Sequence, residues 1–194
     1  MAPSDLTGSG APSPGGAGGE LVDVVDAADR VVGRVTRSIM RSHRLRHRAV
    51  FIIVRSGTGD VLVHRRSPGK DLWPHRWDIA VGGVVGPGED YTVAARRELA
   101  EEVGIEGVEL VEVGGGSYVD ADVSLIGRIY LASHDGPVSF DDGEVVAAEW
   151  VPIAELATRL ERDSWVPDSL VLAVPVLAAR FPDEPWGAMT ISPT

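Results

Sequence analysis

Cysteine is absent from the 194 residues of the chain. Its absence excludes disulfide bridges, zinc–thiolate centres, iron–sulfur clusters and any cysteine nucleophile. A chain without disulfides is compatible with a reducing compartment, and we therefore expect a cytoplasmic protein.

Basic side chains are in the minority. The chain has 18 lysines and arginines against 29 aspartates and glutamates, which gives a formal net charge of −11. General nucleic-acid binders need a basic surface that displaces counterions from phosphates, so we expect no nucleic-acid partner. A local group of basic residues would still be enough to bind a small phosphorylated ligand.

Long apolar runs are also missing. The longest, "LVLAVPVLAA" at 170–179, is too short for a membrane span and contains Pro175. At the N-terminus no basic segment precedes an apolar stretch, so nothing there is typical of a signal peptide. These two features predict a protein without a membrane-inserted segment.

The composition is otherwise that of a globular protein, with 44% hydrophobic and 24% charged residues. Residues 1–20 are almost all Gly, Ser, Pro and Ala, and we expect them to form a disordered tail. A single domain over 21–185 and a short C-terminal tail over 186–194 complete the expected organisation.

Turn signals and apolar periodicity predict the elements of that domain. Strands are expected at 21–25, 30–35, 49–54, 61–66, 77–85, 108–113, 118–120, 124–132 and 145–151. The basic segment 38–47 is helical or irregular, and the segment 114–122 is either a loop that shapes the substrate pocket or a flexible hairpin. Helices are expected from Asp90 or Thr92 to Val103, after Pro152, and over about 167–180. The order predicts an α/β fold, a mixed β-sheet sandwiched between α-helices.

The segment "RRELAEEVGI" at 96–105 concentrates negative charge. On a helix, Glu98, Glu101 and Glu102 lie at i, i+3 and i+4 on one face. Like charges at those spacings destabilise a helix by roughly 0.2–0.5 kcal/mol per pair. The adjoining apolar stripe would anchor the helix to the sheet: Ala95, Leu99 and Val103.

A bound divalent cation would reverse that repulsion. Clustered carboxylates are the hard oxygen environment that Mg²⁺ or Mn²⁺ prefers. The preceding loop contains four glycines and a proline within 82–88, and such a loop can bring backbone carbonyls close to a ligand. Arg97 lies four residues before Glu101 and is placed to orient its carboxylate.

The full pattern from Gly83 to Ile105 reads G, five residues, E, seven residues, R-E-aliphatic-x-E-E-x-G-aliphatic. In this pattern the chain resembles the Nudix family, with a likeness that covers about 21–180. The resemblance implies a Nudix-type fold and a hydrolase of nucleoside diphosphates linked to another group. It also implies catalytic and metal-binding roles for Glu98, Glu101 and Glu102, and a metal-binding carbonyl at Gly82. The implied structural positions of the motif are Gly83, Glu89, Arg97 and Gly104.

The general base varies among Nudix proteins, and here two residues are candidates. Glu98 lies within the motif, and Glu144 lies in "DDGEVVAAEW", where relatives often place a late acidic residue.

Three stretches resemble the isopentenyl-diphosphate isomerase branch of the family: "VDVVDAADRVVG", "LRHRAVFIIV" and "HRRSPGKDLWP". The branch's catalytic cysteine falls on Gly82 and its neighbouring histidine ligand on Val84. Its later acidic ligands fall near Val123 and Leu125. These departures remove the isomerase machinery, while the hydrolase motif is intact.

The same resemblance implies that Arg66 and Lys70 contact a diphosphate, although one of the neighbouring strand residues Arg65 and Arg66 is expected to face solvent. Trp73 and Trp77 are candidates for stacking on a substrate, or for core or lid positions. His47 matches an isomerase metal ligand whose partner histidine is missing, and we expect a structural role for it.

The leading hypothesis is a hydrolase of a small diphosphate compound that depends on Mg²⁺ or Mn²⁺. The alternatives are an isopentenyl-diphosphate isomerase-like activity and a non-catalytic Nudix module that senses a ligand. A small-molecule diphosphate is the expected partner, and the protein is expected to be a monomer or a homodimer.

Overall fold

A computed structural model describes residues 19–183 of the chain. The predicted tails therefore lie almost entirely outside the described residues. At the start of the described chain, the Glu20 carbonyl accepts a hydrogen bond of 2.6 Å from the Arg37 N–H.

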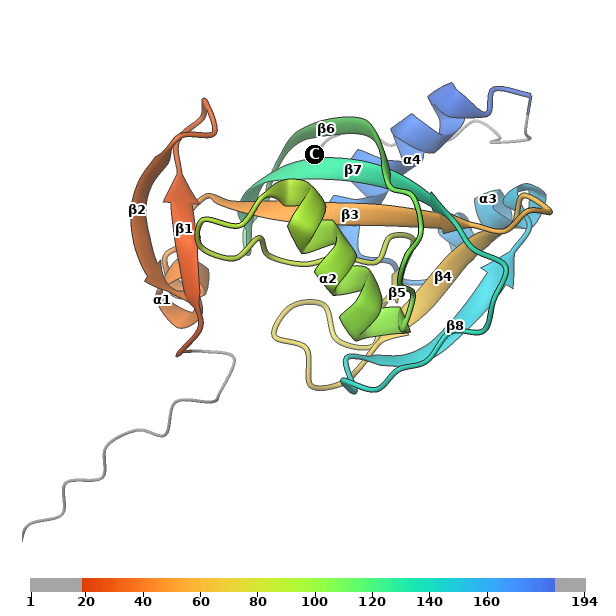
Figure 1. The fold of residues 1–194 in the computed structure, drawn as a ribbon, viewed down its shortest axis with the longest axis horizontal. Helices are drawn as coiled ribbons and strands as arrows, with labels where there is room; N and C mark the ends of the chain where they lie inside the picture. The colour runs from red at the N-terminus through yellow and green to blue at the C-terminus, as the bar shows by residue number, and fades with distance from the viewer. Residues whose placement is uncertain (1–18, 184–194) are drawn as a thin grey trace, which may run out of the picture.

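The described residues form eight strands and four helices (Figure 1). The strands are β1 (Leu21–Val25), β2 (Val31–Thr36), β3 (His47–Arg55), β4 (Val61–Arg66), β5 (Trp77–Asp78), β6 (Val111–Val119), β7 (Ser124–Ser133) and β8 (Val145–Val151). The helices are α1 (Arg37–Ser42), α2 (Tyr91–Val103), α3 (Ile153–Arg162) and α4 (Pro167–Arg180). None of these helices combines the length and apolar character needed to cross a membrane.

Strand β3 lies at the centre of the sheet. It pairs in parallel with β7 along its whole length, and antiparallel with β1 and β4 near its two ends. Strand β8 pairs with β4, and β6 pairs with β7, both antiparallel. Helix α2 crosses one face of the sheet and α4 lies behind the other (Figure 1), which confirms the predicted mixed sheet between helices.

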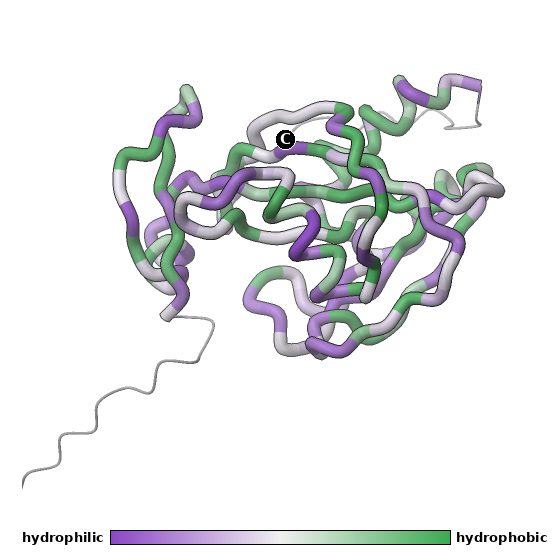
Figure 2. The backbone as a smooth tube through the Cα atoms, viewed as in Figure 1, coloured by the Kyte–Doolittle hydropathy of each residue, from purple (hydrophilic) through white to green (hydrophobic). Residues whose placement is uncertain are grey.

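Alternate residues of β3 enter two separate hydrophobic cores. Phe51 and Ile53 pack in the core that includes α3 and α4, whereas Val50 and Ile52 pack in the core beneath α2. Because successive side chains of a strand point to opposite faces, a strand covered on both faces is a continuous apolar run. The hydrophobic colouring of β3 in Figure 2 follows this arrangement.

The segment predicted as a strand over 77–85 is only partly regular. Regular pairing ends after β5, and the chain then follows β3 through single bridges at Ile52–Val81 and Ala49–Val84. The prediction was too long because the glycines at its end carry no side chains that would stabilise a regular ladder.

The two short strands predicted at 108–113 and 118–120 are parts of one strand, and the loop or hairpin predicted over 114–122 is confined to the turn that follows this strand. A single strand, β6, runs from Val111 to Val119 and contains the three glycines. These glycines allow close packing, because a Cβ on Gly115 would lie 2.8 Å from the Gly127 carbonyl oxygen on β7. A Cβ on Gly116 would lie 3.0 Å from Leu172 on α4.

Two glycines bring the loop before α2 into contact with both β3 and the helix. The Val50 N–H donates to the Gly83 carbonyl at 3.0 Å, and a Cβ on Gly82 would overlap the Val50 carbonyl oxygen. A Cβ on Gly83 would lie 2.5–2.7 Å from the carboxylate atoms of Glu98. Because glycine has no side chain, these two positions allow the short distance between α2 and the sheet.

We predict that Gly82→Ala lowers the free energy of unfolding by roughly 2–4 kcal/mol, because the added methyl group must displace the β3 backbone. The matched control is Gly33→Ala on β2, where a Cβ meets nothing within 4 Å and the change should stay within about 0.5 kcal/mol. Urea unfolding of both variants measures the difference. Equal midpoints would show that the loop can relax away from β3.

Candidate active site

The ends of α2 are fixed by local signals. The Asp90 carboxylate accepts a hydrogen bond of 2.8 Å from the Thr92 N–H and caps the N-terminus. Gly104 has φ of 68°, the left-handed conformation that ends a helix, and its N–H donates to the Ala100 carbonyl. Both ends agree with the sequence-based prediction.

Arg97 is the main cation of the acidic face. Its guanidinium donates to both carboxylate oxygens of Glu89, at 3.1 and 3.0 Å, and to the Val84 carbonyl at 3.2 Å. It also contacts Glu98 at 2.8 Å and Glu101 at 3.0 Å. Arg97 thus joins the loop before α2 to two of the three clustered glutamates, and the predicted contact with Glu101 is one part of a larger network.

Glu98 is the most perturbed acid of this network. It is only 8% exposed and lies against Gly83. Burial, followed by the charge of Glu102, raises the pKa of Glu98 to about 7, although Arg97 opposes the shift. Near neutral pH this carboxyl is therefore divided between its two protonation states.

Glu102 lies four residues after Glu98 on α2 and meets Lys70. The Lys70 ammonium donates to Glu102 at 2.8 Å and also contacts the Glu144 carboxylate from the segment before β8. Burial alone would lower the pKa of Lys70, but the two carboxylates raise it. The Gly82 N–H lies 3.4 Å from the second oxygen of Glu102. A residue predicted to contact the substrate thus bridges two predicted catalytic acids.

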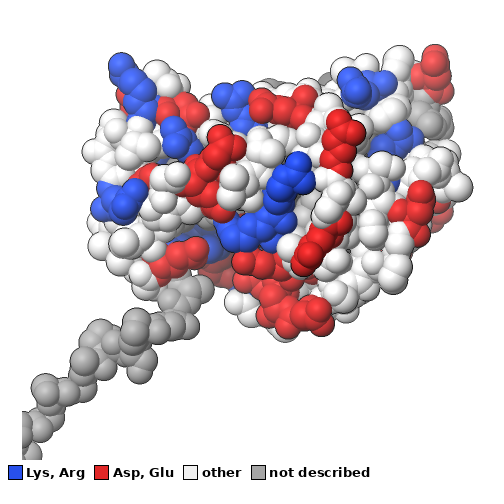
Figure 3. All heavy atoms as spheres, viewed as in Figure 1, with Lys and Arg blue, Asp and Glu red and all other residues white. Residues whose placement is uncertain are grey.

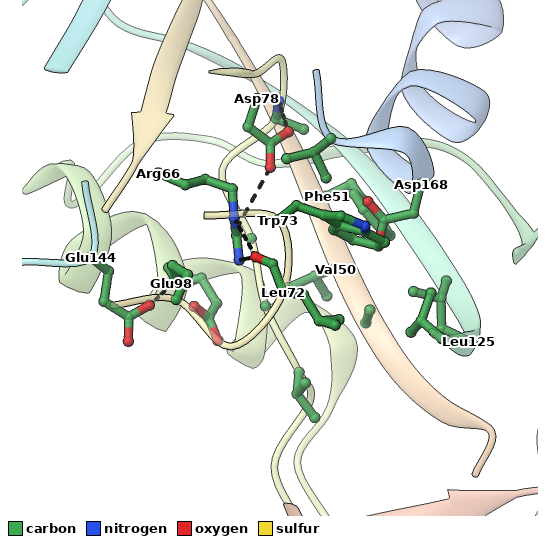
Figure 4. Close-up of a pocket in the computed structure, with 18 of the residues that line it drawn as sticks. Val50, Phe51, Arg66, Leu72, Trp73, Asp78, Glu98, Leu125, Glu144 and Asp168 are labelled. Atoms are coloured by element: carbon green, nitrogen blue, oxygen red, sulfur yellow. Dashed lines mark hydrogen bonds and ion pairs between the residues drawn. The ribbon is translucent and has the colours of Figure 1, made fainter. Parts of the chain in front are cut away.

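A cavity of about 170 Å³ connects these groups to the rest of the site. Figure 4 shows Glu98 and Glu144 at one end, Asp168 and Leu125 at the other, and Arg66 and Trp73 between them. On the molecular face that carries α2, acidic and basic side chains alternate rather than forming separate patches (Figure 3).

The basic side of the cavity includes two arginines that the sequence analysis did not select. Arg37 and Arg41 lie one turn apart on α1 and line the cavity. Asp71 lies 3.7 Å from the Arg37 guanidinium and accepts a hydrogen bond of 3.0 Å from Arg41. In the sequence, the signal for these two arginines was their i, i+4 spacing, with Arg41 inside the basic segment 38–47 and Arg37 directly before it. The sequence did not show that α1 lies beside the cavity.

Arg66 has a structural as well as a cavity-facing role. Its guanidinium donates to the Leu72 carbonyl at 3.3 and 3.2 Å and lies 3.8 Å from the Asp78 carboxylate. The Leu72 contacts hold the loop that carries Trp73.

The two candidate tryptophans have different environments. Trp73 lines the cavity and adopts φ of 46°, a conformation that costs a non-glycine residue on the order of 1–3 kcal/mol. Trp77 instead packs beside Trp165 at 6.5 Å, with the Arg159 guanidinium 4.7 Å from its ring centroid. The structure therefore assigns Trp77 to the core and leaves Trp73 as the candidate for stacking.

His47 lines the same cavity, but its ring is buried and hydrogen-bonds to the Leu45 carbonyl at 3.1 Å. Burial lowers its pKa to about 4, so the ring is neutral. His64 is also buried on β4, and burial lowers its pKa.

The donor set fits a hard divalent cation by its chemistry, since carboxylate and carbonyl oxygens are the preferred ligands. Within residues 19–183, however, no three acidic or histidine side chains converge at metal-binding distance. Arg97 and Lys70 bridge the carboxylates instead. A cation that used these carboxylates would take the place of their ion pairs with Arg97 and Lys70.

Comparison with known proteins supports the same conclusion from sequence and fold. The NUDIX domain model matches residues 45–171. An uncharacterised Nudix hydrolase from Yersinia pestis is 36% identical over 171 residues, which cover 88% of this chain and 92% of that protein. Another, from Streptomyces coelicolor, is 40% identical over 153 residues, which cover 78% and 84%.

The fold is similar to that of a solved structure, DR0079 from Deinococcus radiodurans. The two chains superimpose with a TM-score of 0.69 at 29% identity, and the match covers 83% of this chain and 98% of the other. The complete motif on α2, the packing of its glycine loop and these matches together show that the chain belongs to the Nudix hydrolase family.

Proposed function

We propose that this Nudix hydrolase cleaves the diphosphate bond of a nucleoside-diphosphate-linked or related small molecule with the aid of Mg²⁺ or Mn²⁺. The observation that carries the proposal is a cavity lined both by acids, among them Glu98, Glu101 and Glu144, and by the cations Arg37 and Arg41. Cations in the lining match the charge of a diphosphate, and carboxylates match that of its metal ions. Nudix enzymes generally use such divalent ions.

Glu98, Glu101, Glu102 and the Gly82 carbonyl are the proposed metal ligands. A divalent cation bound there supplies neutralisation of phosphate oxygens and a lower pKa of bound water. Arg97 holds Glu98 and Glu101 in place through its contacts with both. The remaining structural positions, Gly83, Glu89 and Gly104, fix the loop and the helix end.

The diphosphate is proposed to contact the cations of the cavity. Lys70 and Arg66 lie on its wall beside Arg37 and Arg41. If Glu102 held a metal ion, the Lys70 ammonium would have one carboxylate partner fewer and would be available to a phosphate oxygen. Such an exchange of partners would keep the charges of Glu102 and Lys70 compensated.

The base that takes a proton from the attacking water is proposed to be Glu98 or Glu144, since both line the cavity. Burial would raise the pKa of Glu144, but its contact with Lys70 lowers it. Gln variants of each residue discriminate between the two, because loss of the base flattens the rise of kcat with pH.

The second candidate function is isomerisation of isopentenyl diphosphate, favoured by the isomerase-like stretches that supply Arg66, Lys70 and Trp73. Gly82 stands where that branch has its catalytic cysteine, and Val84 where it has a histidine. We predict no exchange of allylic protons when the protein is incubated with isopentenyl diphosphate in deuterated water. Proton exchange above the level of a boiled sample, measured by NMR, would restore the isomerase function.

We predict that Glu101→Gln and Glu102→Gln each lower turnover by about 100-fold or more, because each removes charge from the proposed metal site. Hydrolysis with Mg²⁺ and Mn²⁺, measured by chromatography of the phosphorylated products, would be screened over nucleotide sugars, dinucleoside polyphosphates, oxidised nucleotides, coenzyme A and prenyl diphosphates. The matched control is Glu109→Gln, an exposed acid beyond the end of α2. Equal turnover in all variants would contradict the proposal, and ligand binding without hydrolysis would favour a sensor module.

The raised pKa of Glu98 predicts a pH dependence of stability in the metal-free protein. Its ordinary value is 4.5 and its folded value is about 7, so the folded state binds more protons than the unfolded state between these values. Stability should therefore fall by roughly 1–3 kcal/mol as the pH rises through this window.

Urea unfolding between about pH 5 and about pH 8 measures this fall. Glu98→Gln should flatten the curve, whereas Glu109→Gln should leave it unchanged. The stability of Glu98→Gln should still depend on pH to some extent, because burial also raises the pKa of Asp168 to about 7. Parallel curves for the wild type and Glu98→Gln would contradict the assignment.

A further inference from the structure

The cavity has a second end, away from the acidic face of α2, that the proposed hydrolytic chemistry does not use. Phe51 from β3, Trp73 from its loop and Leu125 from β7 provide apolar walls there. Asp168, in the first turn of α4, points toward these rings from the opposite side (Figure 4). This inner compartment combines an apolar lining with a carboxyl group.

Asp168 is a buried acid without a side-chain partner among the described residues. Its residue is 7% exposed, and one carboxylate oxygen accepts a hydrogen bond of 2.7 Å from the Ser169 N–H. No side chain within residues 19–183 donates to the carboxyl group. Buried carboxyl groups in folded proteins are normally satisfied by several donors, so this one has capacity for a ligand.

The charges around Asp168 favour a neutral donor over a cation. Burial and the nearby Asp78 carboxylate raise the pKa of Asp168 to about 7, while Arg66 and Arg41 act in the opposite direction. Asp78 itself lies 3.8 Å from Arg66. Arg41 and Arg37 also pair with Asp71, so three acids are balanced by three guanidinium groups, and a further positive charge from a ligand would have no unmatched partner.

The backbone of Trp73 provides a further sign that the compartment is built to hold a group. Its left-handed conformation is maintained because Arg66 binds the preceding Leu72 carbonyl. Non-glycine residues kept in this conformation concentrate at binding sites, where the surrounding structure maintains the strain. Here the result is an indole ring placed on the cavity wall near Asp168.

We propose that Asp168 is a specificity-determining residue that accepts a hydrogen bond from a hydroxyl group of the substrate, whose carbon skeleton lies against Trp73 and Phe51. The proposal rests on the proposed function, because it places the diphosphate at the acidic face of α2. It names the substrate class as a diphosphate ester of a hydroxylated group, such as a sugar or polyol.

A purely hydrocarbon group is disfavoured by the same arrangement. Its entry would exclude water from Asp168 and leave the carboxyl group without a donor. Sites built to bind a hydroxyl group reject analogues that lack it much more strongly than apolar sites reject an extra methylene. The compartment therefore opposes a prenyl chain even though its walls are largely apolar.

The experiment compares alkyl diphosphates of increasing chain length with their ω-hydroxy counterparts. We expect the hydroxylated member of at least one pair to bind the wild type about tenfold more tightly. Calorimetry in the presence of Ca²⁺ measures binding, and phosphate release with Mg²⁺ measures turnover. The ω-amino compounds form a third arm, and tighter binding of the amine than of the alcohol would overturn the neutral assignment.

Asp168→Leu should abolish the preference for the hydroxylated compound, and Asp168→Asn, which keeps an oxygen acceptor, should retain part of it. Glu155→Gln, an exposed acid on α3, is the control for Asp168→Asn and should keep the full preference. If the Tm shows that Asp168→Leu does not fold, the comparison of alkyl with ω-hydroxyalkyl diphosphates in the wild type and in Asp168→Asn still tests the proposal. Equal binding of every wild-type pair, or an unchanged preference in a folded Asp168 variant, would overturn the proposal.

The two proposals fail in different ways. Absence of phosphate release from every compound would remove the proposed hydrolysis, while the binding preference would remain measurable. Hydrolysis of alkyl and hydroxyalkyl diphosphates with equal kcat/KM and equal affinity would retain the proposed function and remove the role of Asp168.

Discussion

The site depends on holding three carboxylates of α2 close together at a protein surface that is only partly open to water. Arg97 compensates Glu98 and Glu101, and Lys70 compensates Glu102. The cost of crowding falls mainly on Glu98, which burial holds between its two protonation states. In physical terms the site is a set of anions neutralised by internal cations, and under the proposed function these ion pairs are the contacts that a metal ion would replace.

Much of the fold was predictable because its signals are local. The start and end of α2 follow from Asp90 and Gly104, and the continuous apolar run of β3 follows from burial on both faces. The exceptions lie where glycines stand. The glycines of β6 suggested a loop, but they permit a close approach to β7 and α4. Composition alone does not distinguish a glycine that bends the chain from one that makes room for a neighbour.

The candidate site was predictable to the extent that one motif contains it. The pattern over 83–105 placed the acids on one helix; in the structure Glu98 and Glu101 line the cavity, while Glu102 is buried against Lys70. Arg41 and Asp168 come from opposite ends of the chain and meet only through the tertiary fold. Within its apolar segment Asp168 was the single acid near the start of a helix, which is also a common position for a residue that merely stabilises a helix N-terminus. Burial and the cavity, not the sequence, separate these two roles.

Helix α1 contacts the loop that carries Trp73, and this contact bears on which part of the chain forms the cavity. The family model begins at residue 45, after α1, yet Arg37 and Arg41 line the cavity and hold Asp71 of the loop that carries Trp73. The segment that the family model covers therefore leaves out part of the cavity wall. Relatives can therefore share the motif helix and still differ in the segment before residue 45. Such a difference would change the charge of the cavity wall and the contacts that hold the loop of Trp73.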